Sequence, residues 1–190
     1  AVIYKGKRYT KPSDVLQHAV DHYEAFQEEA KPEPIFDHEY FDYVKRVPAA
    51  ARAGLDRDIT MEETVAALRR LKGKSAGGRS LIPPKMLKSL SGDAIARIHT
   101  LFVSVFRKGY CPKDWMESLV QAIYKGKGDS ENMATRRPIS LTDVISKWYA
   151  TILNSRLVRA LDRFGILSDL QHGSRAGHDC TEAARLVISA

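Results

Sequence analysis

The sequence predicts an α+β fold that is dominated by helices and contains one small antiparallel sheet. Three observations support this prediction. Apolar residues recur at helical spacing in several segments, and most of these segments start at a residue that can cap a helix. Two short runs, Leu119–Tyr124 and Arg137–Leu141, are typical of strands and flank a glycine-containing turn. No internal repeat or low-complexity segment interrupts this pattern.

The length of 190 residues predicts about one ordinary domain, and an apolar fraction of 44% is enough for a hydrophobic core. We divide the chain into an N-terminal helical extension, residues 1–58, and a main domain, residues 59–190. The segment Val47–Arg57 is rich in Ala and Gly and is interpreted as the connector between them.

The N-terminal extension begins with residues 2–9, which predict either a short hairpin or an extended arm. A helix then starts at Pro12-Ser13, and Lys31–Pro34 ends it. Its apolar stripe is expected to contain Leu16, Ala19, Val20, Tyr23 and Phe26. A second short helix is expected at Asp37–Arg46.

The main domain begins with a capping-box pattern, Thr60 with Glu63, that predicts a helix to about Leu71. Pro83-Pro84 starts a short helix, and a longer one follows at Asp93–Lys108, closed by Gly109. Asp143 is expected to cap the longest helix, which ends near Leu161. Its buried face is predicted to be Ile145, Trp148, Tyr149, Ile152, Leu153, Leu157 and Leu161. A final helix is expected from about Asp179.

Composition excludes two classes of protein. No stretch approaches the roughly eighteen apolar residues of a transmembrane helix, so no membrane partner is expected. Only Cys111 and Cys180 are present, without a paired motif, which argues against a disulfide-stapled secreted module. The chain starts at Ala1 rather than Met, so we expect a processed boundary, and a removed organellar transit peptide would fit.

Charge is unevenly distributed along the chain. Residues 1–64 carry 9 basic and 13 acidic residues, a net −4, whereas residues 65–190 carry 21 basic and 10 acidic, a net +11. This asymmetry indicates either a surface that binds a polyanion or a solvated basic surface without a partner.

The most suggestive local chemistry is Lys125-Gly126-Lys127-Gly128 followed by Arg136-Arg137-Pro138. Glycines let backbone amides approach an anion, and Lys and Arg supply a point charge and a planar fork for phosphate oxygens. The segment therefore predicts a phosphate cradle on a hairpin, with an ordinary solvated hairpin tip as the alternative.

Several other motifs fail. Gly73-Lys74-Ser75 resembles the end of a P-loop, but Leu68 stands where that motif needs its first Gly. His172, His178 and Cys180 lack a second ligand pair and are better explained as a polar loop than as a metal site. The ten acids of residues 65–190 are scattered singly, so we expect no two-metal centre, no catalytic residues and no cofactor.

The order of these segments resembles the reverse transcriptases of non-LTR (LINE-type) retrotransposons, from about Ile59 to the C-terminus. There, a helix leads into a lysine-alanine-proline-glycine loop and a proline-led helix, as in Met61–Leu71, Lys74–Gly77 and Pro83–Leu87. Further matches are the G-x-x-P-x-x-W turn (109–115), the fingers hairpin (123–128 with 137–141), the helix after it (144–161) and the block at 165–168 and 171–175.

The resemblance implies that residues 59–190 form a fingers-like domain whose hairpin binds template and the triphosphate of the incoming nucleotide. By this match, Lys125 and Arg137 lie near the triphosphate and Arg175 is the arginine of the following block. The full set of expected phosphate-binding residues is Lys74, Arg79, Lys125, Lys127, Arg136, Arg137 and Arg175.

The sequence also departs from the family pattern. The palm domain, with its two aspartate motifs, would begin after Ala190, so the resemblance is confined to the fingers portion. Gly78-Arg79-Ser80 stands where proline, aspartate and glycine are usual, and Thr135-Arg136 stands where an asparagine and an aromatic are usual. Ser174 replaces a phenylalanine. These changes toward basic or small residues favour a fingers module kept for something other than synthesis.

Three functions are therefore expected. The first is a catalytically incomplete module that binds RNA, with ribosomal RNA as one candidate, as a structural component of a ribonucleoprotein such as an organellar ribosome. It would lie beside other protein subunits in a mitochondrion or other organelle, with the nucleus as the alternative. The second is the N-terminal fragment of an active RNA-directed DNA polymerase, and the third is a protein–protein interaction subunit.

Overall fold

The computed structural model describes residues 1–29, 48–73, 76–168, 171–173, 175, 177–179, 181 and 184–185. The elements in chain order are β1 (Val2–Tyr4), β2 (Lys7–Tyr9), α1 (Pro12–Glu29), α3 (Ala49–Asp56), α4 (Met61–Arg70), η1 (Gly78–Ser80), α5 (Pro84–Lys88), α6 (Gly92–Lys108), α7 (Lys113–Met116), β3 (Ser118–Tyr124), η2 (Met133–Thr135), β4 (Arg136–Thr142) and α8 (Val144–Arg163). The α+β, helix-dominated prediction is confirmed.

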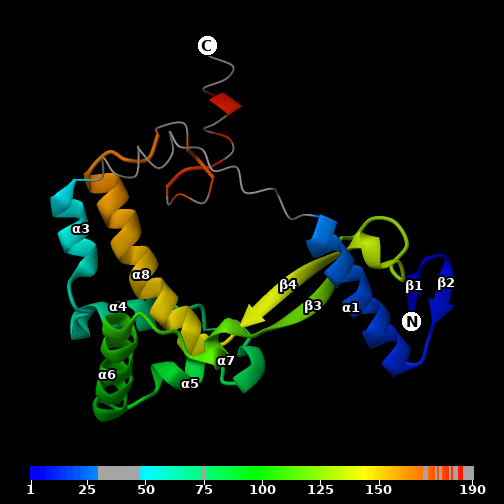
Figure 1. Ribbon diagram of the computed structural model, residues 1–190, viewed down its shortest axis with the longest axis horizontal. Helices are drawn as coiled ribbons and strands as arrows, with labels where there is room; N and C mark the ends of the chain where they lie inside the picture. The colour runs from blue at the N-terminus through cyan, green and yellow to red at the C-terminus, as the bar shows by residue number, and fades with distance from the viewer. Residues whose placement is uncertain are drawn as a thin grey trace.

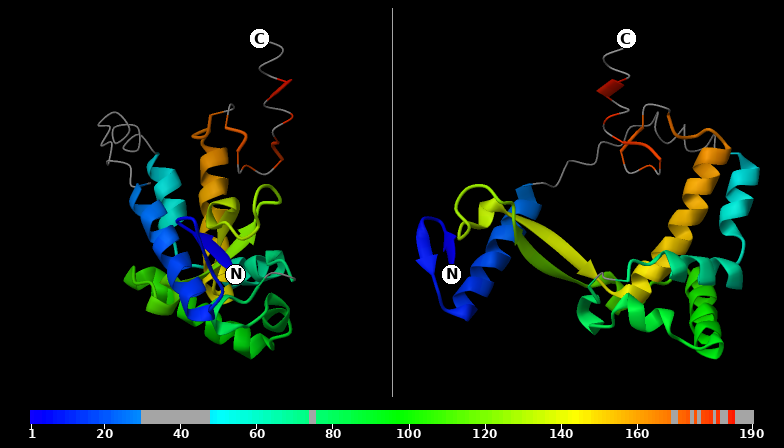
Figure 2. Two further views of the ribbon diagram at one scale, coloured as in Figure 1. Left: turned by 90° about the vertical axis from the view of Figure 1, so that its right-hand side faces the viewer. Right: turned by 180° about the vertical axis from the view of Figure 1, so that it is seen from behind.

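Two two-stranded antiparallel sheets are present in the described residues, where the sequence predicts one. The additional sheet is the β1–β2 hairpin, so of the two alternatives for residues 2–9 the hairpin is correct. The β3–β4 hairpin matches the predicted strands to within one residue at each end. It projects from the helical part, and α1 with β1–β2 lies at its outer end (Figures 1 and 2).

Local capping signals place the helix ends where the sequence predicts them. The hydroxyl of Thr60 accepts from the Glu63 amide and the Glu63 carboxylate accepts from the Thr60 amide, which is a complete capping box. The Asp143 side chain caps α8, and Gly109 ends α6 in the left-handed conformation at φ 59°.

The core lies where α4, α5, α6 and α8 meet, and its buried side chains are Ile59, Ala67, Leu68, Leu71, Leu87, Phe102, Val144, Trp148 and Ile152. The rings of Phe102 and Trp148 meet edge to face at 5.3 Å. The Trp148 indole N–H donates to the carbonyl of Thr64 at 2.8 Å, so the buried ring leaves no polar atom unpaired. Leu157, predicted to be buried, is 46% exposed because α8 extends past the core on that side.

The segment Val47–Arg57 is not a simple connector, since Ala49–Asp56 forms the helix α3. This helix packs along α8 (Figure 1). The sequence pattern did not indicate this helix, because its packing depends on α8, about a hundred residues further along the chain. The proposed boundary between residues 58 and 59 stays a prediction.

The apolar stripe of α1 is also oriented differently from the prediction. Leu16 and Phe26 are 68% and 58% exposed. The half-buried face instead carries His18, whose ring lies 5.1 Å from Tyr4 and 3.9 Å from Tyr9. Aromatic contacts with β1–β2, rather than aliphatic burial, therefore position α1. The predicted helix at Asp37–Arg46 lies outside the described residues. Most residues of the predicted final helix also lie outside them.

None of the described helices combines enough length with enough apolar character to span a bilayer.

Candidate nucleic-acid interface

The β3–β4 hairpin is the frame of the predicted phosphate site. Seven residue pairs, from Ser118 with Thr142 to Tyr124 with Arg136, hold the two strands in register. Beyond Tyr124, the chain forms a loop rather than a tight turn, and η2 returns it to β4. The phenol of Tyr124 donates to the Gly128 carbonyl at 2.5 Å, and Gly128 itself has φ 80°, which a glycine adopts without strain.

The predicted residues Lys125, Lys127 and Arg137 are exposed on the hairpin. Within the described part of the chain, the side chains of Lys127 and Arg137 make no hydrogen bond or ion pair. Lys127 lies in the loop, and Arg137 pairs with Ile123 across the strands. Their charges are therefore available to an anion that approaches the hairpin.

Lys125 and Arg136 instead help to hold the loop. The ammonium of Lys125 donates to the Ala134 carbonyl at 2.9 Å. The guanidinium of Arg136 is half-buried and donates to the carbonyl of Ser130 at 2.6 Å and to that of Ala122 at 3.4 Å. Arg136 therefore stabilises the loop, whereas the exposed Lys125 keeps two further N–H groups that can reach a ligand.

The remaining predicted residues do not join this group. Arg79, in η1 at the base of the hairpin, forms an ion pair with Glu117. Arg175 donates to the carbonyl of Ser168 at 3.2 Å and to the carboxylate of Asp162 at 3.4 Å. Asp162 is near the far end of α8, roughly 27 Å along that helix from the hairpin. Lys74 lies outside the described residues.

At the start of η1, two glycines occupy positions where a side chain would clash with the backbone. A Cβ on Gly77 would lie 2.6 Å from the Ile82 carbonyl oxygen. Gly78 has φ 66°, and a Cβ there would lie 2.5 Å from the Thr142 carbonyl oxygen. Gly78, the first residue of η1, is thus packed directly against the end of β4.

Sequence analysis missed a buried ion-pair network between α3, α4 and α8. The guanidinium of Arg156, only 5% exposed, donates to both oxygens of Glu63 at 2.7 and 3.0 Å. It also donates to the carbonyls of Leu55, Arg57 and Asp58, at 3.2, 2.6 and 2.6 Å. Arg156 therefore fixes the chain between α3 and α4.

Electrostatics at Glu63 follow from these contacts. Burial raises the pKa of this carboxyl and is the largest single influence. Hydrogen bonds from Arg156, from the Thr60 amide and from Arg57, with the charge of Arg156, together outweigh burial and lower the pKa from 4.5 to about 2. The sequence does contain a signal for this network, because Arg156 lies within the apolar face of α8 and a charge occupies such a position only with a partner.

Among the described residues, no cluster of three or more His, Cys, Asp or Glu side chains could hold a metal ion. The rings of His172 and His178 lie 5.2 Å apart, edge to face. Cys180, the third residue of that sequence cluster, lies outside the described residues.

Comparison with known proteins agrees with the motifs. No family model matches the chain. Similarity searches find relatives of one class, RNA-directed DNA polymerases of non-LTR retrotransposons, and this confirms the resemblance. The chain is thus similar to part of a reverse transcriptase.

Three relatives, all from Drosophila melanogaster, illustrate the extent of the similarity. The chain is 32% identical over 119 residues to the probable RNA-directed DNA polymerase from transposon X-element. It is 30% identical over 126 residues to that from transposon BS, and 26% identical over 131 residues to the polymerase from mobile element jockey. These matches cover 63–69% of this chain but only 13–14% of the relatives, so the chain spans a small part of their length.

Proposed function

We propose that the chain is the fingers-like part of an RNA-directed DNA polymerase of a non-LTR retrotransposon, and that it holds nucleic acid. The observation that carries this proposal is the similarity to such polymerases over about two-thirds of the chain. A hairpin with a basic loop, followed by the long helix α8, is also the arrangement that the resemblance implies.

Within this function, the β3–β4 hairpin contacts phosphate groups through Lys127 and Arg137, with Lys125 as a third donor. Exposed cations on a rigid two-stranded frame fix the register of a nucleic acid without reading its sequence. Arg136 has a different role, since its two terminal nitrogens donate to the backbone carbonyls of Ala122 and Ser130.

The 190 residues alone are not expected to extend a primer. Phosphoryl transfer needs carboxylates that hold two metal ions about 4 Å apart, and the acids of residues 65–190 are scattered singly in the sequence. In this proposal, those carboxylates belong to another part of the polymerase.

Of the three functions expected from the sequence, the relatives favour the polymerase fragment. Nothing in the comparisons supports a place in an organellar ribosome, and that role is not part of the proposal. The organellar compartment, like the nuclear alternative, stays a prediction.

The test is fluorescence anisotropy of a labelled RNA template–DNA primer duplex with the 190-residue protein, titrated at several KCl concentrations. The variant Lys127→Ala/Arg137→Ala removes two exposed cations from the hairpin. The control Arg97→Ala/Lys108→Ala removes the same two residue types from exposed positions on α6.

Loss of two phosphate contacts should reduce the slope of log K against log[KCl] by about 1.8 and weaken binding several-fold or more at 0.1 M salt. The control should change the slope much less. Equal effects of the two double variants, or wild-type binding that does not depend on salt, would contradict the proposal.

A further inference from the structure

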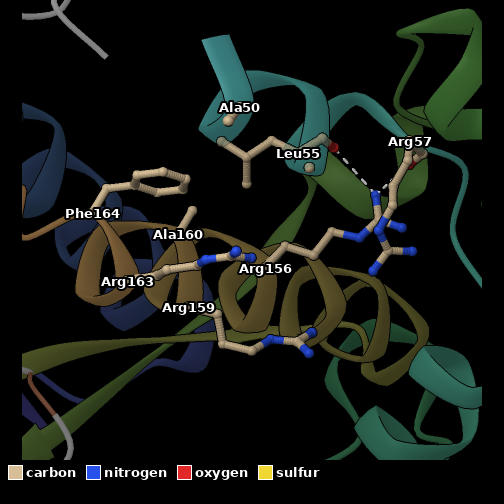
Figure 3. A pocket seen from close by; sticks show the side chains of 9 residues that line it. Ala50, Leu55, Arg57, Arg156, Arg159, Ala160, Arg163 and Phe164 are labelled. Carbon is tan, nitrogen blue, oxygen red and sulfur yellow. Dashed lines mark hydrogen bonds between the residues drawn. The ribbon is translucent and has the colours of Figure 1, made fainter. Parts of the chain in front are cut away.

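A basic cavity of about 420 Å³ lies between α3 and α8, away from the hairpin. Its lining includes four arginines, which are Arg57, Arg156, Arg159 and Arg163 (Figure 3). Leu55, Ala160 and Phe164 form its apolar part. Three of the arginines belong to α8, at positions i, i+3 and i+7, so they lie along one side of that helix.

Three of the four guanidiniums, those of Arg57, Arg156 and Arg159, lie within 4 Å of one carboxylate, that of Glu63. Glu63 accepts from Arg156 and Arg57 at 2.7 Å each, and Arg159 lies 3.6 Å from it. Arg156 is 3% exposed at its side chain and its donors are used, so its role is structural. Arg159, by contrast, is 65% exposed, and Arg163 is exposed beside the Phe164 ring, 5.6 Å from the ring centre.

The positive surface continues past the cavity along α8. Arg159 also lines a neighbouring cavity of about 220 Å³ between α4 and α8, together with Arg70. The exposed Arg70 donates to the hydroxyl of Ser155 at 2.8 Å, one turn before Arg159. We call Arg70, Arg159 and Arg163 the α8 arginine strip. The two cavities together contain five arginines and two carboxylates, Glu62 and Glu63.

The shape of this surface indicates the form of its ligand. Arg159 and Arg163 are one turn apart, roughly 6 Å along the axis, and Arg70 extends the same line. A small anion would need donors that converge on one point, whereas guanidiniums spread along a helix suit a chain of repeated negative charges. The planar fork of arginine also matches the oxygens of a phosphate group.

We propose that the α8 arginine strip binds the phosphodiester backbone of single-stranded RNA as a second contact, separate from the hairpin. This rests on the proposed function, because the strip matters only in a protein that holds nucleic acid. Arg159 is 15 positions into α8, roughly 22 Å from its hairpin end, so one RNA strand must be several nucleotides long to reach both surfaces.

The experiment uses the 190-residue protein and a labelled single-stranded RNA of about twenty nucleotides of mixed sequence. The variant Arg159→Ala/Arg163→Ala leaves the Glu63–Arg156 pair in place, and its thermal unfolding midpoint is measured to confirm that the fold is retained. Arg97→Ala/Lys108→Ala is again the charge-matched control, and Lys127→Ala/Arg137→Ala reports on the hairpin.

If the strip contributes two phosphate contacts, the salt slope falls by about 1.4 and affinity falls about 20-fold at 0.1 M KCl, while the control changes little. A strip variant that behaves like the control overturns this inference, whatever the hairpin variant does. If instead the hairpin variant behaves like the control while the strip variant has a strong effect, the hairpin role is contradicted and the strip inference is supported.

An acidic protein segment is the other ligand that such a surface could attract. A labelled polyglutamate peptide of matched charge is therefore titrated under the same conditions. Tighter binding of this peptide than of RNA, lost in Arg159→Ala/Arg163→Ala, would overturn the assignment to RNA.

Discussion

The buried pair of Glu63 and Arg156 should make the free energy of unfolding of this protein depend on pH, with lower stability in acid. The perturbation is Glu63→Gln, which removes the negative charge but retains the side-chain shape and some of its hydrogen bonds. A pKa held at about 2 rather than 4.5 corresponds to about 3 kcal/mol of folding free energy when Glu63 is ionised. Solvent reaches the site past the exposed Arg57 and Arg159, so we expect about 2 kcal/mol to be realised.

The sign follows from the direction of the shift. Since the pKa is lower in the folded protein, the stabilisation is complete above about pH 4.5 and is lost as the pH falls toward 2. The assay is urea unfolding followed by tryptophan fluorescence at pH 7 and at pH 2.5. Wild type should exceed Glu63→Gln by about 2 kcal/mol at pH 7, and the difference should fall to about a quarter of that value at pH 2.5, just above the folded-state pKa.

The matched control is Glu62→Gln, one residue away in the same first turn but exposed. Its effect at pH 7 should be much smaller than that of Glu63→Gln, because the Glu62 carboxylate is exposed. Equal losses from the two substitutions would refute the reasoning, because an exposed carboxylate would then matter as much as a buried paired one. A difference between wild type and Glu63→Gln that does not change with pH would refute it equally.

Two further predictions concern packing. Gly78→Ala should lower the free energy of unfolding by at least about 2 kcal/mol, because the new Cβ would meet the Thr142 carbonyl and a φ of 66° disfavours a side chain. The control Gly92→Ala places its Cβ in open space and should be nearly neutral. Chemical denaturation measures both variants. Trp148→Phe should lower the free energy of unfolding by about 2 kcal/mol, since it removes buried volume and the donor to the Thr64 carbonyl. An unchanged melting midpoint, measured by circular dichroism, would contradict this prediction.

Much of the fold could be predicted because its signals are local. The capping box of Thr60 and Glu63 and the glycine after α6 act within one helical turn, so their positions in the sequence were enough. The strands of the hairpin were likewise visible from their composition and from the glycines between them.

The candidate site was only partly predictable, because exposure and pairing depend on distant residues. Arg136 and Arg137 are neighbours in the sequence, but alternation along β4 leaves one half-buried under the loop and the other exposed. From the sequence, Arg79 was expected to be available to phosphate, but the fold places Glu117 beside it and the two form an ion pair.

The sequence by itself determined the helix ends, the hairpin and the similarity to retrotransposon polymerases, since each of these is encoded in short contiguous segments. Only the tertiary structure decided which cations remain available. Arg156, Arg159 and Arg163 belong to one helix, yet the packing of α3 and α4 against it buries the first with Glu63 and leaves the other two in solvent. The physical reason is that a buried charge needs a partner, and that partner lies more than ninety residues away in the chain.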